Sequence, residues 1–307
     1  MTNSNRETME KINLNNYIQT GEGANGVSYV SMTDPDEMVK LYSPSFKVEN
    51  IYGEYENSRK LYSIGVQTPE PGTIVTDGER TGIRFRRIVG KRSYARMFAD
   101  EPARTDEFAR EMARECKKFH SITPPEGLFI NVKDDYLRML DSDRTMTQTE
   151  RRKMADVIGS RPDAATLLHG DMHFGNIIST LPAGAPLSEP HKVYFIDLQS
   201  VSCGHPLFDL GMLYLICHVC DEDFRFQNFH ITSSRTVKVW DSFVDEYFFA
   251  EDNLAEKFFG PGQTPESVTE EIIPYTCIKF LLVGYNLNGE LPDMYMNYVR
   301  ENFFTRF

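Results

Sequence analysis

The sequence predicts an α+β protein in two parts: a small N-terminal part with an antiparallel sheet and one helix, and a larger, mainly helical C-terminal part. Segments of strand composition alternate with turns before residue 90, apart from one helical segment, and helical spacing prevails after it. A chain of 307 residues with 40% hydrophobic residues can bury one large core or two smaller ones. We therefore expect residues 1–90 and 91–307 to form separate lobes.

The N-terminal part is predicted from its glycines and its periodicity. Gly21-Glu22-Gly23-Ala24-Asn25-Gly26 separates two segments of strand composition, and the residues after it indicate a returning hairpin strand rather than the helix that follows a Rossmann glycine motif. Helical spacing between residues 46 and 64 stops at Gly65. The expected strands are Tyr17-Ile18, Val27–Val30, Glu37–Tyr42, Thr73–Thr76 and Gly82–Val89, with a turn at Asp77–Arg80 and an interlobe crossing at Gly90–Arg92.

The C-terminal part is predicted to contain helices and two short buried strands. The helices are expected at Asp106–His120, Thr147–Ile158, Asp209–Val219, Arg235–Phe249 and Ser267–Asn286. Thr166–Leu168 and Val193–Ile196 are short and partly β-branched, as buried strands are, and Leu181–Pro190 is a loop between them. We expect the carboxyl ends of both strands to lie at the same sheet edge.

The most informative segment follows the first of these strands. His169–Asn176 reads His-Gly-Asp-Met-His-Phe-Gly-Asn, and Asp197 ends the apolar run Val193–Ile196. A carboxylate after His-Gly, an asparagine five positions later and a second carboxylate at a strand end form the layout that phosphoryl transfer requires. Asp171 would orient an acceptor hydroxyl and take its proton late, while Asn176 and Asp197 would offer Mg²⁺ hard oxygen ligands.

A phosphate-binding site is expected in the N-terminal part. The predicted hairpin contains three glycines, Gly21, Gly23 and Gly26. Without Cβ atoms its backbone can close over phosphates and donate N–H groups to them. Lys40 stands in an apolar strand, where a lone ammonium is costly, so an anion should lie near it. The candidates are the α and β phosphates of ATP and a carboxylate on the following helix, with Glu56 as first choice and Glu54 as the alternative.

Together these residues resemble the aminoglycoside phosphotransferase and choline kinase family of the protein-kinase-like superfamily. The resemblance covers roughly residues 12–290 and is most specific between 169 and 211, where Gly204-His205-Pro206-Leu207-Phe208-Asp209-Leu210-Gly211 follows the two aspartates. It implies a bilobal protein-kinase-like fold, with ATP bound between a sheet lobe, residues 1–90, and a helical lobe, residues 91–307, that holds the catalytic loop and the acceptor site.

The resemblance also implies a role for each matching position. Gly21, Gly23 and Gly26 are assigned to the phosphate-covering loop, Lys40 to the α and β phosphates, Glu56 to the ion pair with Lys40, Asp171 to catalysis, and Asn176 and Asp197 to magnesium. Asp209 would tie the catalytic loop to a helix that begins near it. Two departures stand out: Gln199 occurs where relatives often carry an acidic residue or glycine, and Arg86 and Arg87 occupy the region expected to bind adenine, which leaves the purine preference open.

Two motifs invite a metal interpretation that we do not favour. His169 and His173 stand four apart, but the neighbouring glycines argue against the helix that would place both on one metal, so His169 is expected to hydrogen-bond its own loop. Cys217-His218-Val219-Cys220 resembles half a metal site, yet no second pair of matching spacing exists, and a core helix explains it better.

The charge distribution excludes some partners and suggests another. The chain has 45 acidic and 33 basic residues, a net charge of −12, and residues 91–307 account for −10 of it. Nucleic acid is therefore not an expected partner. An acidic helical lobe would attract a cationic hydroxyl compound such as an aminoglycoside or a choline-like alcohol. Ordinary solubilising surface is the competing explanation and the one we favour for most of these acids. The candidate acids are Asp221, Glu222, Asp223, Asp245, Glu246, Glu251 and Asp252.

A group of aromatic residues in the same region has two possible uses. Its members are Phe224, Phe226, Phe229, Tyr247, Phe248 and Phe249. They would stack a sugar or box a quaternary ammonium, or they would pack in the core, which is the more common use.

Five cysteines without a small-scaffold spacing indicate reduced thiols in a cytoplasm. Met1–Glu10 is polar and lacks an apolar core, so neither a signal peptide nor a membrane anchor is expected there. We therefore expect a cytoplasmic, ATP- and Mg²⁺-dependent phosphotransferase that acts on a hydroxyl of a small molecule. Two alternatives remain: a protein kinase, disfavoured by the His-Gly-Asp and Ile-Asp-Leu forms, and a nucleotide-binding pseudokinase that acts through a protein partner.

Overall fold

A computed structural model describes residues 9–23 and 25–307. The predictions for Met1–Glu10 therefore fall almost entirely outside the described residues, as does the part of the glycine-rich stretch at Ala24. In the described part of the chain, no helix is both long enough and apolar enough to cross a membrane.

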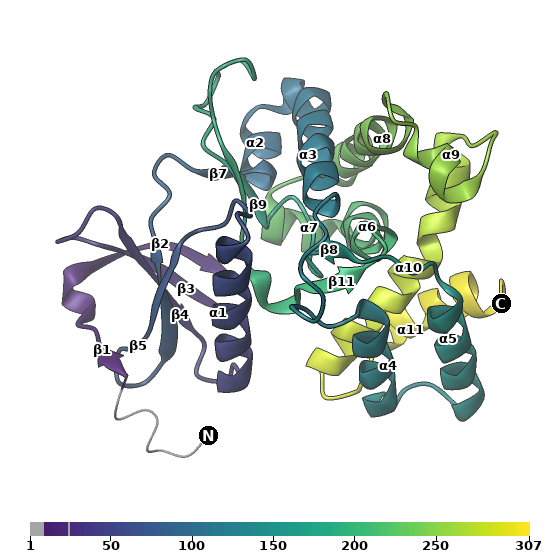
Figure 1. The fold of residues 1–307 in the computed structure, drawn as a ribbon, viewed down its shortest axis with the longest axis horizontal. Coiled ribbons are helices and arrows are strands. Elements are labelled where there is room, and N and C mark those ends of the chain that lie inside the picture. Colours follow the sequence, from purple (N-terminus) through teal and green to yellow (C-terminus); the bar gives the residue numbers. More distant parts are fainter. Residues whose placement is uncertain (1–8, 24) are drawn as a thin grey trace. The chain divides into compact units, whose positions relative to one another are not determined.

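The chain packs as two compact units (Figure 1). One comprises the described residues up to Arg92 together with Ile178–Ser200, and the other comprises Ser93–Ile177 and Val201–Phe307. The sequence places the division after residue 90, close to the first of these limits. It places residues 178–200 in the larger part, whereas they pack with the first unit.

The first unit is built on a six-stranded sheet of the order β1-β5-β6-β4-β3-β2. Its strands are β1 (Glu10–Lys11), β2 (Tyr17–Gly23), β3 (Gly26–Ser31), β4 (Glu37–Tyr42), β5 (Pro71–Thr76) and β6 (Thr81–Arg86). All neighbouring strands are antiparallel except β1, which runs parallel to β5 at the edge. The predicted hairpin and the antiparallel sheet are therefore confirmed, with one short parallel strand added.

Both faces of this sheet are covered by apolar residues. Met38 and Tyr42 of β4 pack with Ile51 of α1 (Val48–Ser63), which covers one face. Val39 and Leu41, the alternate residues of β4, pack with Ile12 and Val75 on the other face. This alternation follows from the two-residue period of a strand, and it places Lys40 on the same face as α1.

Hydrogen bonds from both main chain and side chain join the segment 178–200 to the rest of the first unit. Phe195 N donates to Gln67 O at 3.0 Å, and Asn57 Nδ2 of α1 donates to Leu198 O at 3.0 Å. The strands β9 (Ile177–Ser179) and β10 (Val193–Phe195) belong to a three-stranded sheet of the order β10-β9-β7, with β7 at Arg92–Ser93.

The strands that precede Asp171 and Asp197 do not share a sheet edge, so that prediction is wrong. The strand β8 (Thr166–Leu168), which precedes Asp171, pairs with β11 (Ser202–Gly204), whereas β10, which precedes Asp197, pairs with β9. Short apolar runs of this kind indicate buried strands but carry no information about their partners.

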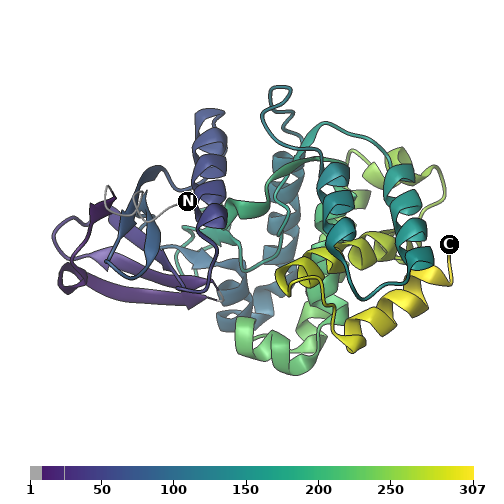
Figure 2. The same cartoon turned by 90° about the horizontal axis from the view of Figure 1, so that it is seen from below.

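The second unit is mainly helical (Figures 1 and 2) and also contains the short β8–β11 pair. They are α2 (Tyr94–Asp100), α3 (Thr105–His120), α4 (Val132–Ser142), α5 (Gln148–Ser160), α6 (Leu207–Tyr214), α7 (Glu222–Phe229), α8 (Ser233–Phe249), α9 (Leu254–Phe259), α10 (Pro265–Asn286) and α11 (Asp293–Val299). The predictions for α3, α5, α6, α8 and α10 are confirmed. Most of the other helices have only six to eight residues, too few for an apolar period to stand out.

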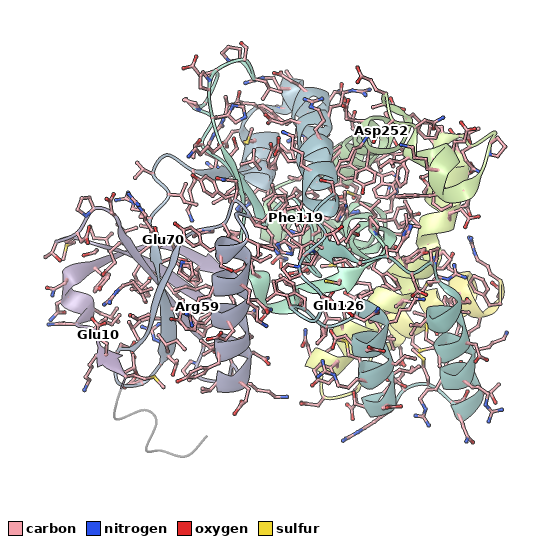
Figure 3. The ribbon with its side chains drawn as sticks, viewed as in Figure 1. Glu10, Arg59, Glu70, Phe119, Glu126 and Asp252 are labelled. Atoms are coloured by element: carbon pink, nitrogen blue, oxygen red, sulfur yellow. The ribbon has the colours of Figure 1, made fainter. Side chains whose placement is uncertain are left out.

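Two helix pairs form much of this unit. The helices α6 and α10 approach closely at Gly211, where a Cβ would lie 2.7 Å from the carbonyl carbon of Tyr275, and Thr276 Oγ1 donates to Gly211 O at 3.0 Å. The helices α3 and α8 pack alongside, and Lys117 of α3 forms an ion pair of 2.7 Å with Asp252, labelled in Figure 3 just beyond α8.

His205 makes the stability of this unit depend on pH. Burial, with the charges of His120 and Lys133, lowers the pKa of the His205 imidazole from 6.5 to about 4. Between these pH values the unfolded chain binds a proton that the folded chain excludes, so the stabilisation is complete above pH 6.5 and is lost as the pH falls to 4.

We expect His205→Gln to remove this contribution to the pH dependence. For the wild type the free energy of unfolding should fall by about 2–3 kcal/mol more than for the variant between neutral pH and pH 4. Urea unfolding at half-unit pH steps measures both curves. Parallel curves for the two proteins would contradict the assignment.

Candidate active site

Lys40 of β4 lies between two carboxylates in the first unit. Its Nζ is 3.0 Å from Glu54 Oε1 of α1 and also contacts Asp197 Oδ1, which follows β10. The lysine side chain is 15% exposed and the Glu54 side chain 3%, so this pair is shielded from water. The prediction that an anion lies near Lys40 is confirmed.

The carboxylate on the helix is Glu54, so the prediction of Glu56 is wrong. Glu56 Oε1 lies 3.5 Å from Arg59 Nη1, and both of these side chains are exposed. The buried stripe of α1 contains Ile51, Glu54, Ser58 and Leu61, at helical spacing. Glu54 follows Ile51 by three residues and so lies on this stripe, a signal that was present in the sequence.

The charges of this cluster depend on one another. Burial by itself would lower the pKa of the Lys40 ammonium, but the carboxylates of Asp197 and Glu54 outweigh burial and raise that pKa. Burial raises the pKa of Glu54, and the charge of Lys40 opposes that rise. Lys40 therefore stays charged, and its ammonium is held at a fixed place on the sheet.

Asp197 has a backbone conformation that non-glycine residues seldom adopt. Its φ is 60°, in the left-handed region. Such conformations cost free energy and cluster at functional sites, where the surrounding structure enforces them. The side chain of Asp197 is 40% exposed, so it is accessible to solvent, unlike that of Glu54.

The three glycines of the β2–β3 hairpin differ in whether the surrounding structure has space for a Cβ atom. A Cβ at Gly21 or Gly23 would meet no atom closer than 4.0 Å. A Cβ at Gly26 would lie 2.3 Å from Leu41 O and 2.9 Å from Tyr42 Cα. Gly26 is therefore required by the close approach of β3 to β4, while Gly21 and Gly23 leave open space above the hairpin.

We expect Gly26→Ala to lower the free energy of unfolding by about 1–3 kcal/mol, because the backbone of β4 must move away from the new methyl group. The control is Gly53→Ala in α1, where a Cβ meets nothing within 4 Å. That change should raise the free energy of unfolding by about 0.5–1 kcal/mol. Chemical denaturation measures both, and a Gly26→Ala protein as stable as the wild type would contradict the packing argument.

The loop after β8 in the second unit holds Asp171 beside Asn176. Asn176 Nδ2 donates to Asp171 Oδ2 at 3.1 Å and to Asp171 O at 3.0 Å. Asn176 is buried, whereas the side chain of Asp171 is 25% exposed. Met172 and Phe174 are buried, so the loop is fixed by alternate buried residues, while Asp171, just before them, stays partly exposed.

Asp209 fixes the start of this loop. The residue lies in the first turn of α6 and is 1% exposed. Its carboxylate accepts hydrogen bonds from His169 N at 2.6 Å and from Gly170 N at 2.8 Å, and from His120 Nε2 at 3.1 Å. Burial would raise the pKa of Asp209, but the His120 hydrogen bond and charge outweigh burial and lower it. The expected link between the loop that carries Asp171 and a helix is thus present in the structure.

A family model described as "Phosphotransferase enzyme family" matches residues 13–233. The chain belongs to this family. The matched range includes Lys40 and Asp197 of the first unit and Asp171, Asn176 and Asp209 of the second.

Several solved phosphotransferases share the fold. Amicoumacin kinase hAmiN, solved with AMP-PNP, Ca²⁺ and Ami, aligns with a TM-score of 0.55 and 11% identity over 97% of this chain and 90% of that chain. The gentamicin complex of APH(2")-IIa aligns with a TM-score of 0.53 and 17% identity over 94% and 91%. APH(3'')-Id from Streptomyces rimosus aligns with a TM-score of 0.50 and 18% identity over 85% and 92%.

At these identities the likeness concerns the fold, which is protein-kinase-like as predicted. A search of curated proteins found no match to this chain.

The two histidines of the loop that carries Asp171, His169 and His173, hydrogen-bond within that loop. His169 Nδ1 accepts from Asp171 N at 3.2 Å, which confirms the prediction that His169 hydrogen-bonds its own loop. His173 Nδ1 accepts from Gly175 N at 3.0 Å, and His173 Nε2 lies 3.8 Å from Asp171 Oδ2. Within residues 9–23 and 25–307, no three His, Cys, Asp or Glu side chains are grouped so as to hold a metal. The Cys217–Cys220 segment forms part of a buried helical turn, as the core interpretation predicts.

Most of the acidic candidates of the second unit have structural partners. Asp245 pairs with Arg110, Glu246 with Arg114, and Asp252 with Lys117, which ties α8 and its end to α3. Asp221 caps α7 by accepting from Phe224 N, and Glu222 accepts from Ser233 N. For these residues the interpretation as ordinary surface is the better one.

The aromatic candidates divide into two groups. Tyr247 and Phe248 are buried in the core. Phe224 and Phe226 of α7 are exposed, and Phe229 contacts the ring of His173 with a centroid distance of 5.4 Å. The helix α7 therefore lies against the loop that carries Asp171.

Sequence reasoning missed one polar residue of this region, Lys279 of α10. It is buried, and its Nζ donates a hydrogen bond to Gly170 O beside Asp171. The signal available was a lysine inside the long apolar run of the helix, the same signal that identified Lys40.

Proposed function

We propose that this protein is an ATP- and Mg²⁺-dependent phosphotransferase that transfers the γ-phosphate to a hydroxyl of a small molecule. The observation that carries the proposal is the Asp171–Asn176 pair, a partly exposed carboxylate on a loop fixed by the buried Asp209. Family membership and the Lys40 cluster support it. Every polar group that this chemistry needs is present, so a non-catalytic role has no observation in its favour.

The residues assigned to nucleotide and metal have the right chemistry. Magnesium, when bound, offsets the negative charge of the phosphates, and the hard oxygens it prefers are those of Asn176 Oδ1 and the Asp197 carboxylate. Both hydrogen bonds of the Asn176 amide use Nδ2, which leaves the assignment of Oδ1 to the metal consistent with the local geometry. The Lys40 ammonium would bind phosphate oxygens, and the open space above Gly21 and Gly23 admits them.

The Asp171 carboxylate is the group that would contact the hydroxyl of the acceptor substrate. It would accept a hydrogen bond from the acceptor hydroxyl, aim the oxygen at the γ-phosphorus and take the proton as the new bond forms. We propose an acceptor that presents a hydroxyl close to a cationic or apolar group, because the exposed Phe224 and Phe226 lie on a helix whose first turn also carries the exposed Asp223. The five free cysteines support a reducing compartment such as the cytoplasm.

The test is MgATP consumption by the purified protein against aminoglycosides, choline-like alcohols, amino alcohols and sugars. Mass spectrometry should find one acceptor heavier by a phosphoryl group, and that product should be missing with Asp171→Asn. The same screen with GTP decides the purine preference.

Bound nucleotide without any phosphorylated product would contradict the enzymatic proposal and favour the pseudokinase alternative. Phosphorylation of added proteins in place of small molecules would favour a protein kinase.

A further inference from the structure

The structure contains a buried lysine that the proposed mechanism does not use. Lys279 lies in α10 between the buried residues Ile278 and Phe280, and it is only 2% exposed. Burial lowers the pKa of its ammonium, which the charges of Asp171, Asp209 and Asp135 oppose. An apolar side chain would fill this core position without the cost of removing a charge from water. The lysine therefore needs a reason other than packing.

The contact made by Lys279 gives that reason. Its Nζ donates to Gly170 O, across 109 residues of sequence. Gly170 O belongs to the peptide group that joins Gly170 to Asp171. The N–H of the same peptide group, Asp171 N, donates to His169 Nδ1 at 3.2 Å. Both polar ends of the peptide group that carries Asp171 are thus bound.

Such a double constraint matters because this peptide group is otherwise easily reoriented. Gly170 has a φ of +77°, and glycine crosses between positive and negative φ at little cost. Asp209 holds the N–H groups of His169 and Gly170, which belong to the two preceding peptide groups, and leaves the orientation of the Gly170–Asp171 peptide group undecided. Rotation there would move the Cα of Asp171 and so redirect its carboxylate.

We propose that Lys279 is a positioning residue that locks the Gly170–Asp171 peptide group and thereby aims the Asp171 carboxylate at the acceptor hydroxyl. This inference rests on the proposed function of Asp171. It assigns α10 a part in the reaction, although Lys279 itself is buried and touches neither substrate. A charged donor suits the task, because hydrogen bonds from ionised groups are about twice as strong as neutral ones.

The test variant is Lys279→Met, which keeps the shape of the side chain and removes the donor and the charge. The matched control is Thr276→Val, one turn earlier on the same helix, which removes a buried hydrogen bond to Gly211 O away from the loop. Two measurements are made on the full chain: amide hydrogen exchange by mass spectrometry, and steady-state kinetics with the acceptor found by the screen.

We expect Lys279→Met to speed exchange in the peptide that covers residues 168–176 by about tenfold or more, while Thr276→Val leaves that peptide unchanged. We expect kcat to fall by roughly 10²-fold in Lys279→Met, with the KM for MgATP within about threefold of the wild type. Thr276→Val should keep its kcat even though its thermal stability falls.

Several outcomes would overturn the proposal. A folded Lys279→Met protein with wild-type kcat would show that the loop does not need the lysine, and unchanged exchange would show that Lys279 does not fix it. If Lys279→Met does not fold, Lys279→Gln is measured in the same way, and failure of both to fold would make Lys279 a residue of stability alone. If the wild type transfers no phosphate, the proposed function fails, and hydrogen exchange still decides whether Lys279 holds the loop.

Discussion

Asp171→Asn is expected to lower the kcat of phosphoryl transfer by roughly 10²- to 10⁴-fold and to leave the affinity for MgATP nearly unchanged. The amide has the shape of the carboxylate and still accepts the hydrogen bond from Asn176 Nδ2, so the loop should keep its conformation. The amide of the Asp171→Asn variant cannot take the proton of the acceptor hydroxyl. The hydroxyl oxygen therefore stays a weak nucleophile.

Single-turnover kinetics and equilibrium binding of a fluorescent nucleotide measure the two quantities separately. The control is Asp134→Asn, an exposed carboxylate in the first turn of α4, which should leave both unchanged. A turnover number equal to that of the wild type in Asp171→Asn would make the assignment of Asp171 wrong. A large loss of nucleotide affinity would instead indicate that the loop had changed its conformation.

Glu54→Gln is expected to reduce kcat/KM for MgATP by roughly 10- to 100-fold, because the neutral amide no longer forms an ion pair with the Lys40 ammonium. Lys40 would then be held by Asp197 alone, which diverts Asp197 from its proposed role with magnesium. The free energy of unfolding should fall by about 1–3 kcal/mol, since one partner of a buried ion pair is lost while the other remains.

Glu56→Gln is the matched control, two residues along the same helix. Its carboxylate is exposed and pairs with Arg59, a contact worth less than about 1 kcal/mol. It should leave kcat/KM and stability close to those of the wild type. Equal effects of the two substitutions, or a larger effect of Glu56→Gln, would contradict the assignment of Glu54.

The candidate site shows what a motif can and cannot predict. The sequence predicted an anion beside Lys40, because an uncompensated ammonium in an apolar strand is costly. It did not predict that Asp197 also contacts Lys40, since the two residues are 157 positions apart and only packing brings them together. The choice of Glu56 over Glu54 was wrong, because Glu54 and not Glu56 lies on the buried stripe of α1.

The limits of the compact units illustrate the same point. Residues 178–200 follow the catalytic loop directly and are expected to stay with it, yet hydrogen bonds to Gln67 and Asn57 join them to the first unit. Sequence order predicts which segments follow one another along the chain. Hydrogen bonds between distant segments depend on the completed fold.

By itself the sequence determined the elements with strong periodicity, the glycine hairpin and the family of the chain, and it predicted the catalytic residues, which stay a prediction. These features follow from local rules, because the period of a segment reports which of its own sides is buried, and the spacing of polar residues reports which chemistry they can perform together. The tertiary structure alone decided that Glu54 and Asp197 share Lys40, that β8 and β10 join different sheets, and that Lys279 reaches the loop beside Asp171. A buried polar side chain needs a hydrogen-bond or ion-pair partner wherever it lies. The packing of the elements, rather than the segment that carries the side chain, decides which partner it meets.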